Sequence, residues 1–306
     1  MDLEESKRAF YTRCLALNLS PETLKQYEKV LKRFSLFDKE VLKKGDTEKV
    51  TADDIRNHLN SLSATMKPVT QKIHYMSLKV FFNFLYREGL IRENPMSRIE
   101  RPKIPQREVQ SYNRQEVFKL INGFDKTSFI GYRNHTIMTI FFSTGMRRGE
   151  LTRLLLSDIH FDVNIIQVIG KGNKQRSIPM SITLRRTLKE YIRKREEYID
   201  RMSYYMNSYL LINCKGEPMS PMAVYDVFKV AADRQKITGV RVSPHTFRHT
   251  FAKYFLLNGG DIFSLQKILG HSDIAVTKKY VSLNDKEIRI QNDRYNPLDN
   301  LSWRYY

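Results

Sequence analysis

The sequence contains few cysteines and no long apolar run. Cys14 and Cys214 are its two cysteines among 306 residues, and they lie far apart. Two such cysteines do not form the disulfide framework of a small secreted domain, so we expect a reducing, cytoplasmic setting. No apolar run approaches the length of a membrane span, and the start MDLEESKRAF carries too much charge for a secretory signal. The sequence therefore predicts a protein that does not act at a membrane.

Acidic residues are scarce relative to basic ones. The chain has 33 Asp plus Glu against 52 Lys plus Arg, which gives a formal net charge of +19. This excess indicates a polyanionic partner, and nucleic acid is favoured over a membrane surface. A chain of 306 residues is also long enough for two domains with separate cores.

The most informative stretch begins at Ser243. Ser243 followed by Pro244 predicts a helix start, because a serine oxygen caps free amides and proline is tolerated at the first helical position. This helix would place His245 and Arg248 on one face, and Gly259-Gly260 would end it.

A second helix is expected over 262–269, ended by Gly270. His271 follows directly, and Tyr280 would lie in a third short helical segment. Two histidines, an arginine and a tyrosine on consecutive short helices are suited to binding an anionic centre and attacking it with a phenol.

Two simpler interpretations compete for these residues. A His-x-x-Arg pair such as His245 and Arg248 is usually a solvated helix face. His245 and His249 also have the i, i+4 spacing of a zinc helix, but Thr246 stands where the protease motif has Glu. With no further ligand evident nearby, we expect no metal.

Further cations lie upstream. A buried helix is predicted over 132–143, broken at Thr144-Gly145, and Arg147 emerges there with Glu150 on the same face. A pinned arginine suits a phosphate clamp, although a surface ion pair between Arg147 and Glu150 is an equal alternative. Residues 165–179 predict a β-hairpin whose glycine-rich turn carries Lys171 and Lys174. The turn lacks the Gly-Lys-Ser/Thr ending of a nucleotide-binding loop, so we expect no cofactor.

The amino-terminal part is predicted to be helical. Helices are predicted to start at Ser20-Pro21 and at Thr51, and the strongest periodic segment covers 69–87. Its predicted inward stripe comprises Ile73, Met76, Val80, Phe81, Phe84 and Leu85. We therefore expect a helical domain over 1–94, an extended basic linker with several prolines over 95–110, and a mixed domain over 111–306.

Taken together, these segments resemble the tyrosine recombinase (phage integrase-like) family, in its simple two-domain, Xer-like form. The resemblance is carried by TGMRRGEL at 144–151, GKGNKQR at 170–176, HTFRH at 245–249, LGH at 269–271 and Tyr280. It implies a fold that is mainly α with a small antiparallel β-sheet (α+β). An all-helical core-binding domain and a mixed catalytic domain would form a C-shaped clamp on DNA.

The resemblance also implies a role for each matching residue. Tyr280 would be the nucleophile that forms a 3′-phosphotyrosyl link, and Arg147 and Arg248 would hold the non-bridging oxygens. Lys171 would protonate the leaving 5′-oxygen, His245 would assist proton transfer at the tyrosine, and His271 would hydrogen-bond the phosphate. Glu150 would steady the site. The residues that we expect to contact DNA elsewhere are Lys25, Lys29, Arg101, Lys103, Lys174 and Arg176.

The resemblance further implies a dimer on one double-stranded recombination site and a tetramer in the synapse. The tail over 284–306 would dock either on a neighbouring protomer or on its own domain. Two other functions compete: a type IB topoisomerase-like DNA relaxase, and a DNA-binding regulator with vestigial catalytic residues. The sequence leaves open the target site, any accessory proteins, and the choice between dimer resolution and integration or excision of a mobile element.

Overall fold

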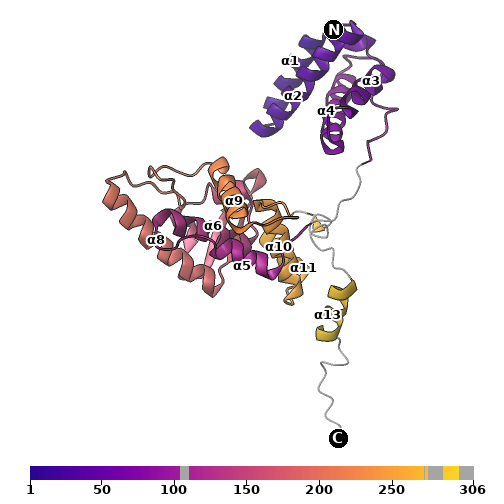
Figure 1. The fold of residues 1–306 in the computed structure, drawn as a ribbon. Coiled ribbons are helices and arrows are strands. Elements are labelled where there is room, and N and C mark those ends of the chain that lie inside the picture. Colours follow the sequence, from indigo (N-terminus) through magenta and orange to yellow (C-terminus); the bar gives the residue numbers. More distant parts are fainter. Residues whose placement is uncertain (104–109, 272, 275–284, 296–306) are drawn as a thin grey trace. The chain divides into compact units, whose positions relative to one another are not determined.

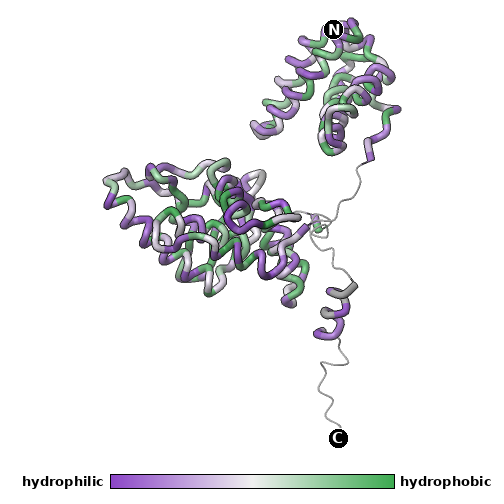
Figure 2. The backbone as a smooth tube through the Cα atoms, viewed as in Figure 1, coloured by the Kyte–Doolittle hydropathy of each residue, from purple (hydrophilic) through white to green (hydrophobic). Residues whose placement is uncertain are grey.

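The computed structural model describes residues 1–103, 110–271, 273–274 and 285–295. The chain forms two compact units, Met1–Arg107 and Glu108–Tyr306. Most described residues are helical, and the described strands form one small sheet in the second unit (Figure 1). Along the helices of both units, hydrophobic residues alternate with hydrophilic ones, as amphipathic helices around a core require (Figure 2). No helix among the described residues has the length and apolar character needed to span a bilayer.

Local capping signals define the helices of the first unit. Ser20 caps α2 by accepting a hydrogen bond from the Thr23 amide, with proline in the first turn. Thr51 and Asp54 form a capping box at the start of α3, where a helix start was predicted. The elements of this unit are α1 (Leu3–Ala16), α2 (Pro21–Phe37), η1 (Asp38–Leu42), η2 (Thr47–Lys49), α3 (Ala52–Ser63) and α4 (Pro68–Arg87).

Half of the inward stripe predicted for α4 is wrong. Phe81, Phe84 and Leu85 are buried, as expected, whereas Ile73, Met76 and Val80 are exposed. The buried face of α4 also includes five residues that are absent from the predicted stripe: His74, Tyr75, Ser77, Leu78 and Phe82. Apolar residues occur on both faces of this helix, so its periodicity alone does not identify the inner one.

The core of the first unit extends past residue 94. Met96 and Ile99 are buried in it, and the Tyr75 hydroxyl donates to the Ile99 carbonyl at 3.0 Å. The beginning of the segment expected to be a linker is therefore packed. The division into domains over 1–94 and 111–306 with a linker over 95–110 stays a prediction.

The core of the first unit contains two buried histidines, and three of their ring nitrogens form no hydrogen bond within the described residues. His58 is 1% exposed and His74 2%, and their ring centroids are 6.1 Å apart. Both ring nitrogens of His58 and Nδ1 of His74 are unpaired within the described structure. Burial lowers the pKa of His58 to about 4, helped by the nearby charges of His74 and Arg33. The folded unit therefore favours a neutral His58.

This arrangement predicts that acid destabilises the first unit. An unfolded histidine takes up a proton near its ordinary pKa of about 6.5, whereas folded His58 does so near 4. The contribution of neutral His58 to the free energy of unfolding is complete above the pKa of the unfolded histidine. It is lost as pH falls from there towards 4, by about 3 kcal/mol at most. We expect His58→Leu to reduce the acid sensitivity of α3 and α4, measured by hydrogen exchange corrected for its intrinsic pH dependence. An unchanged pH profile in the variant would contradict this account.

The second unit builds its core around α6 (Phe129–Thr144). Ile137, Ile140 and Phe141 of this helix are fully buried, and α6 packs on α8 (Ile182–Met202) and α10 (Pro244–Leu257). The other helices are α5 (Arg114–Asn122), α7 (Arg148–Leu151), η3 (Leu156–Asp158), η4 (Lys171–Asn173), α9 (Pro221–Gln235), α11 (Ile262–Leu269) and α13 (Asp285–Tyr295). The predicted helix start at Ser243 and the predicted helix stop at Gly270 are confirmed.

The predicted β-hairpin is confirmed. Strands β2 (Ile165–Ile169) and β3 (Gln175–Pro179) pair antiparallel, with Ile166 opposite Ile178 and Val168 opposite Arg176. A short strand β1 (Ile159–His160) adds to β2, which gives the order β1-β2-β3. The structure therefore confirms a mainly α fold with a small antiparallel sheet.

Two tight turns connect this core to the candidate site. Gly145 ends α6 with φ of +59° and Gly270 ends α11 with φ of +66°, a region that favours glycine. A Cβ at Gly145 would lie 2.4 Å from a ring carbon of Phe251 and 2.8 Å from Leu269. The chain therefore turns sharply just before Arg147 and just before His271, while packed closely against α10 and α11.

Helix α13 packs on its own unit. Gln291 donates to the Leu256 carbonyl at 2.9 Å, and Lys253 forms an ion pair with Glu287 at 2.6 Å. These contacts attach α13 to α10 within one chain. The other residues of the predicted tail, 284 and 296–306, lie outside the described residues.

Candidate active site

Arg147 lies at the break after α6, where it is the first residue before α7. Its side chain is 43% exposed, and its guanidinium forms an ion pair with Glu150 Oε1 at 2.9 Å. Its backbone amide donates to Glu150 Oε2 at 2.7 Å. The predicted ion pair is therefore present, and it leaves much of the arginine surface open to solvent.

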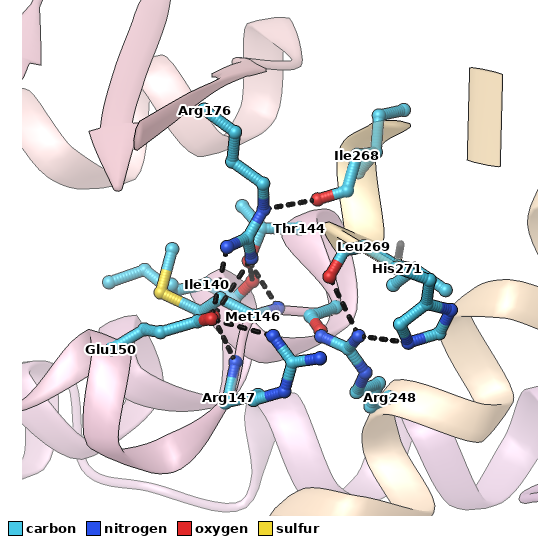
Figure 3. A network of polar contacts seen from close by, with 11 residues as sticks. Ile140, Thr144, Met146, Arg147, Glu150, Arg176, Arg248, Ile268, Leu269 and His271 are labelled. Atoms are coloured by element: carbon cyan, nitrogen blue, oxygen red, sulfur yellow. Dashed lines mark hydrogen bonds and ion pairs between the residues drawn. The ribbon is translucent and has the colours of Figure 1, made fainter. Parts of the chain in front are cut away.

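Glu150 connects Arg147 to the β-hairpin (Figure 3). Its side chain is 2% exposed, and it receives a bidentate pair from Arg176, at 3.0 Å to Oε1 and 2.8 Å to Oε2. Burial alone would raise the pKa of Glu150, but hydrogen bonds from Arg176 and Arg147 and the charge of Arg176 lower it to about 2. The carboxylate is therefore ionised across the physiological range, and it orients Arg147 through both the backbone and the side chain.

Arg248 on α10 is held by the ends of two other helices. It is 2% exposed, and it donates to the Gly145 carbonyl at 2.6 Å and to the Leu269 carbonyl at 2.8 Å. The first of these carbonyls lies two residues before Arg147, and the second lies two residues before His271. Figure 3 shows Arg248, Arg147 and His271 together around these turns.

His271 accepts a hydrogen bond from Arg248. The guanidinium nitrogen lies 2.6 Å from His271 Nε2, and arginine has no acceptor, so the ring proton is assigned to Nδ1. Burial lowers the pKa of His271 to about 4, and the charges of Arg248, Arg147 and Arg176 contribute. A neutral ring with its proton on Nδ1 has the form that a hydrogen-bond donor to a phosphate requires.

His245 lies one turn before Arg248 on α10, with an exposed side chain. Its ring centroid is 4.7 Å from that of His249. Desolvation by the surrounding protein lowers the pKa of His245, followed by the charges of Arg248, Arg147 and Arg241. A histidine kept neutral beside cations can accept a proton at pH 7. Within the described parts of the chain, no group of three His, Cys, Asp or Glu side chains could hold a metal ion.

Lys171 and Tyr280 are described only in part or not at all. Lys171 begins η4 in the turn between β2 and β3, and the turn is closed by the Gly170 amide, which donates to the Lys174 carbonyl at 2.8 Å. The side chain of Lys171 and all of Tyr280 lie outside the described residues. The structure thus brings Arg147, Glu150, His245, Arg248 and His271 into one region, and the roles of all the candidate residues stay predictions.

The expected DNA contacts fall into two groups. Lys25, Lys29, Arg101, Lys103 and Lys174 are all exposed. Arg176 differs, because its side chain is 12% exposed and bound to Glu150 and to the Ile268 carbonyl. Sequence analysis missed this contact. The signal in the sequence was Glu150, an acidic residue within the basic motif TGMRRGEL. Its partner Arg176 lies 26 residues away in the chain, so the sequence does not show the pairing.

Comparison with known proteins matches both units to one family. Residues 112–287 match the Phage integrase family, and residues 11–89 match the Phage integrase, N-terminal SAM-like domain. Tyrosine recombinase XerD of Listeria monocytogenes serotype 4b (strain F2365) is 32% identical over 285 residues, covering 91% of this chain and 94% of the relative. Tyrosine recombinase XerC of Anoxybacillus flavithermus (strain DSM 21510 / WK1) is 30% identical over 259 residues, covering 84% and 85%.

Solved structures share the fold. The XerA recombinase crystal structure is 26% identical with a TM-score of 0.54, and the match covers 96% of this chain and 99% of that one. XerH bound to its palindromic difH substrate is 19% identical with a TM-score of 0.73, and the match covers 90% of this chain and 80% of XerH. The Tn1549 transposon integrase in complex with transposon right end DNA is 18% identical with a TM-score of 0.76, covering 96% and 99%.

Proposed function

Because the chain belongs to the phage integrase family of tyrosine recombinases, which break and rejoin DNA, we propose that it is a site-specific recombinase working through a 3′-phosphotyrosyl intermediate. The observation that carries the proposal is the shared network of Arg147, Glu150, Arg248 and His271 (Figure 3). The guanidiniums of Arg147 and Arg248 and the neutral imidazole of His271 lie together at the ends of α6 and α11.

In the proposed cleavage step, the oxygen of Tyr280 bonds to a DNA phosphorus atom and the bond to the 5′-oxygen breaks. The phenol proton passes to His245, whose lowered pKa keeps it able to accept one. The departing 5′-oxygen takes a proton from the Lys171 ammonium. Rejoining reverses these transfers, and the phosphotyrosyl bond preserves the energy of the phosphodiester, so no ATP is consumed.

The arginines act on the charge of the transition state. A pentacoordinate phosphorus concentrates negative charge on its oxygens, and fixed guanidiniums stabilise it more strongly than mobile water does. Arg248 is fixed by the Gly145 and Leu269 carbonyls, and Arg147 by Glu150. His271 would donate from Nδ1 to the same phosphate.

We propose that the helical and catalytic domains grip duplex DNA as a C-shaped clamp. The exposed Lys25 and Lys29 would contact the duplex from one domain, Arg101 and Lys103 from the linker, and Lys174 from the hairpin. A dimer would occupy one site and a tetramer the synapse, acting in the cytoplasm. The biological role would be either dimer resolution or movement of a mobile element. Strong similarity to Xer recombinases favours a recombinase over a DNA relaxase.

A two-site plasmid assay tests this function. Footprinting on repeats that flank the gene identifies a candidate site, which is then placed once or twice, in direct repeat, on a supercoiled plasmid. We expect the plasmid with two sites to resolve into two circles and the plasmid with one site to give no such products. Relaxation of every plasmid, with or without a site and without resolution, would identify a relaxase instead.

A further inference from the structure

Arg176 lies on strand β3 and contacts two other segments of the candidate site. Its guanidinium binds Glu150 through two hydrogen bonds, and its Nε donates to the Ile268 carbonyl at 2.8 Å. Its side chain also lies against Gly270, where an added Cβ would be 2.8 Å from Arg176 Cδ. Strand β3, α7 and the end of α11 are therefore joined by one side chain (Figure 3).

The same ion pair lies beside the turn that carries Lys171. A Cβ at Gly170 would be 3.5 Å from Arg176 Nη1 and 3.7 Å from Glu150 Oε1, so the backbone of Gly170 is close to both side chains. Lys171 is the next residue. Strand pairing places Arg176 opposite Val168, which is 1% exposed, so the base of the hairpin is also anchored in the core.

The contact with α11 connects the hairpin to the other half of the site. Ile268, whose carbonyl Arg176 holds, precedes Leu269, whose carbonyl Arg248 holds, and His271 follows two residues later. Glu150 in turn holds Arg147. Movement of Arg176 would therefore shift the start of the Lys171 turn relative to both arginines.

We propose that Arg176 is a positioning residue that sets the place of the Lys171 turn relative to the phosphate-binding arginines. The inference rests on the proposed function, in which Lys171 protonates the leaving oxygen. A short, exposed turn samples many conformations by itself, and a planar guanidinium with donors in fixed directions restrains it better than a single point charge. Arg176 would thus affect proton transfer from Lys171 to the leaving oxygen only by restraining the turn, without contacting the reacting atoms.

The test compares two leaving groups on a nicked, single-turnover cleavage site. In the ordinary substrate, the Tyr280 oxygen displaces the 5′-oxygen, which needs a proton from Lys171. In a substrate with sulfur at the bridging 5′ position, a thiolate departs and needs no proton. Loss of the proton donor therefore slows the first reaction far more than the second, whereas loss of phosphate binding slows both.

We expect Arg176→Met to slow cleavage of the ordinary substrate by about 100-fold, a typical contribution of general acid catalysis. On the sulfur substrate its defect is expected to shrink at least about 10-fold, as for Lys171→Ala. Arg193→Met is the matched control: Arg193 also binds two carboxylates, Glu190 and Glu197, but on an exposed face of α8. The control is expected to cleave both substrates at the wild-type rate.

Arg176→Lys covers the case in which Arg176→Met fails to fold, because it keeps a cation beside the buried Glu150. It loses the bidentate geometry, so we expect about 10-fold slower cleavage of the ordinary substrate and near wild-type cleavage of the sulfur substrate. Equal defects on the two substrates, or wild-type rates for Arg176→Lys on both, would overturn the proposal. Failure of the wild-type protein to form any covalent adduct would instead reject the proposed function.

Discussion

Tyr280→Phe is expected to abolish covalent attachment to DNA. The variant lacks the one oxygen that the proposed mechanism bonds to phosphorus, and no other group in the scheme can replace it. On a nicked site that traps the intermediate, wild-type protein should form an adduct visible by denaturing electrophoresis, and the variant should form none. DNA binding, measured by mobility shift, should be unchanged, because a phenyl ring keeps the bulk of the side chain.

Tyr295→Phe provides the matched control. Tyr295 is the last residue of α13 and is 46% exposed. The Tyr295→Phe substitution also removes a tyrosine hydroxyl, from a nearby part of the sequence. The adduct yield of this variant should equal that of wild type. Adduct formation by Tyr280→Phe would show that another residue is the nucleophile.

Arg248→Ala is expected to slow cleavage by about 1,000-fold, the upper range for removing one preorganised donor to a developing oxyanion. Arg248 is 2% exposed and is fixed by two backbone carbonyls, so no neighbouring side chain can move into its position without disturbing the turns. The measurement is the single-turnover rate on a nicked site. Arg234→Ala, in the exposed last turn of α9, should leave the rate unchanged.

A neutral substrate separates phosphate binding from general structural damage. Replacing one non-bridging oxygen by methyl removes the charge that Arg248 is proposed to stabilise. The defect of Arg248→Ala should therefore be much smaller on the methylphosphonate than on the phosphodiester. The same defect on both substrates would mean that Arg248 supports the fold alone, since Gly145 and Leu269 lose their donor in either case.

Local chemistry made several parts of the fold predictable. The starts of α2, α9 and α10 each have serine followed by proline, and the serine oxygen accepts from a backbone amide three residues later in each case. Such contacts involve neighbours in sequence, so the sequence contains the whole signal. The hairpin over 165–179 is equally local, because its strands are joined by a short turn.

Other features depended on neighbours distant in sequence. The exposure of Ile73 and Met76 on α4 is decided by which face meets α2 and α3, and apolar residues occur on both faces. Helix α1 was missed, although Asp2 and Glu5 form a capping box there.

The candidate site was predictable in its residues but not in its connections. The motifs that resemble those of tyrosine recombinases pointed to Arg147, Arg248 and His271, which the structure places around the same two turns. The inward orientation of Arg176 could not be deduced, because it follows from a carboxylate on α7 and a carbonyl on α11. An arginine in a basic motif is compatible with a DNA contact until its buried partner is known.

The most direct test of the mechanism is to identify the atom that joins protein to DNA. Wild-type protein is trapped on a nicked site, digested with protease and nuclease, and analysed by tandem mass spectrometry. We predict one nucleotide-bearing peptide, with a 3′-phosphate esterified to the oxygen of Tyr280 and a free 5′-hydroxyl on the released strand. Attachment at any other side chain, or through a 5′-phosphate, would contradict the account.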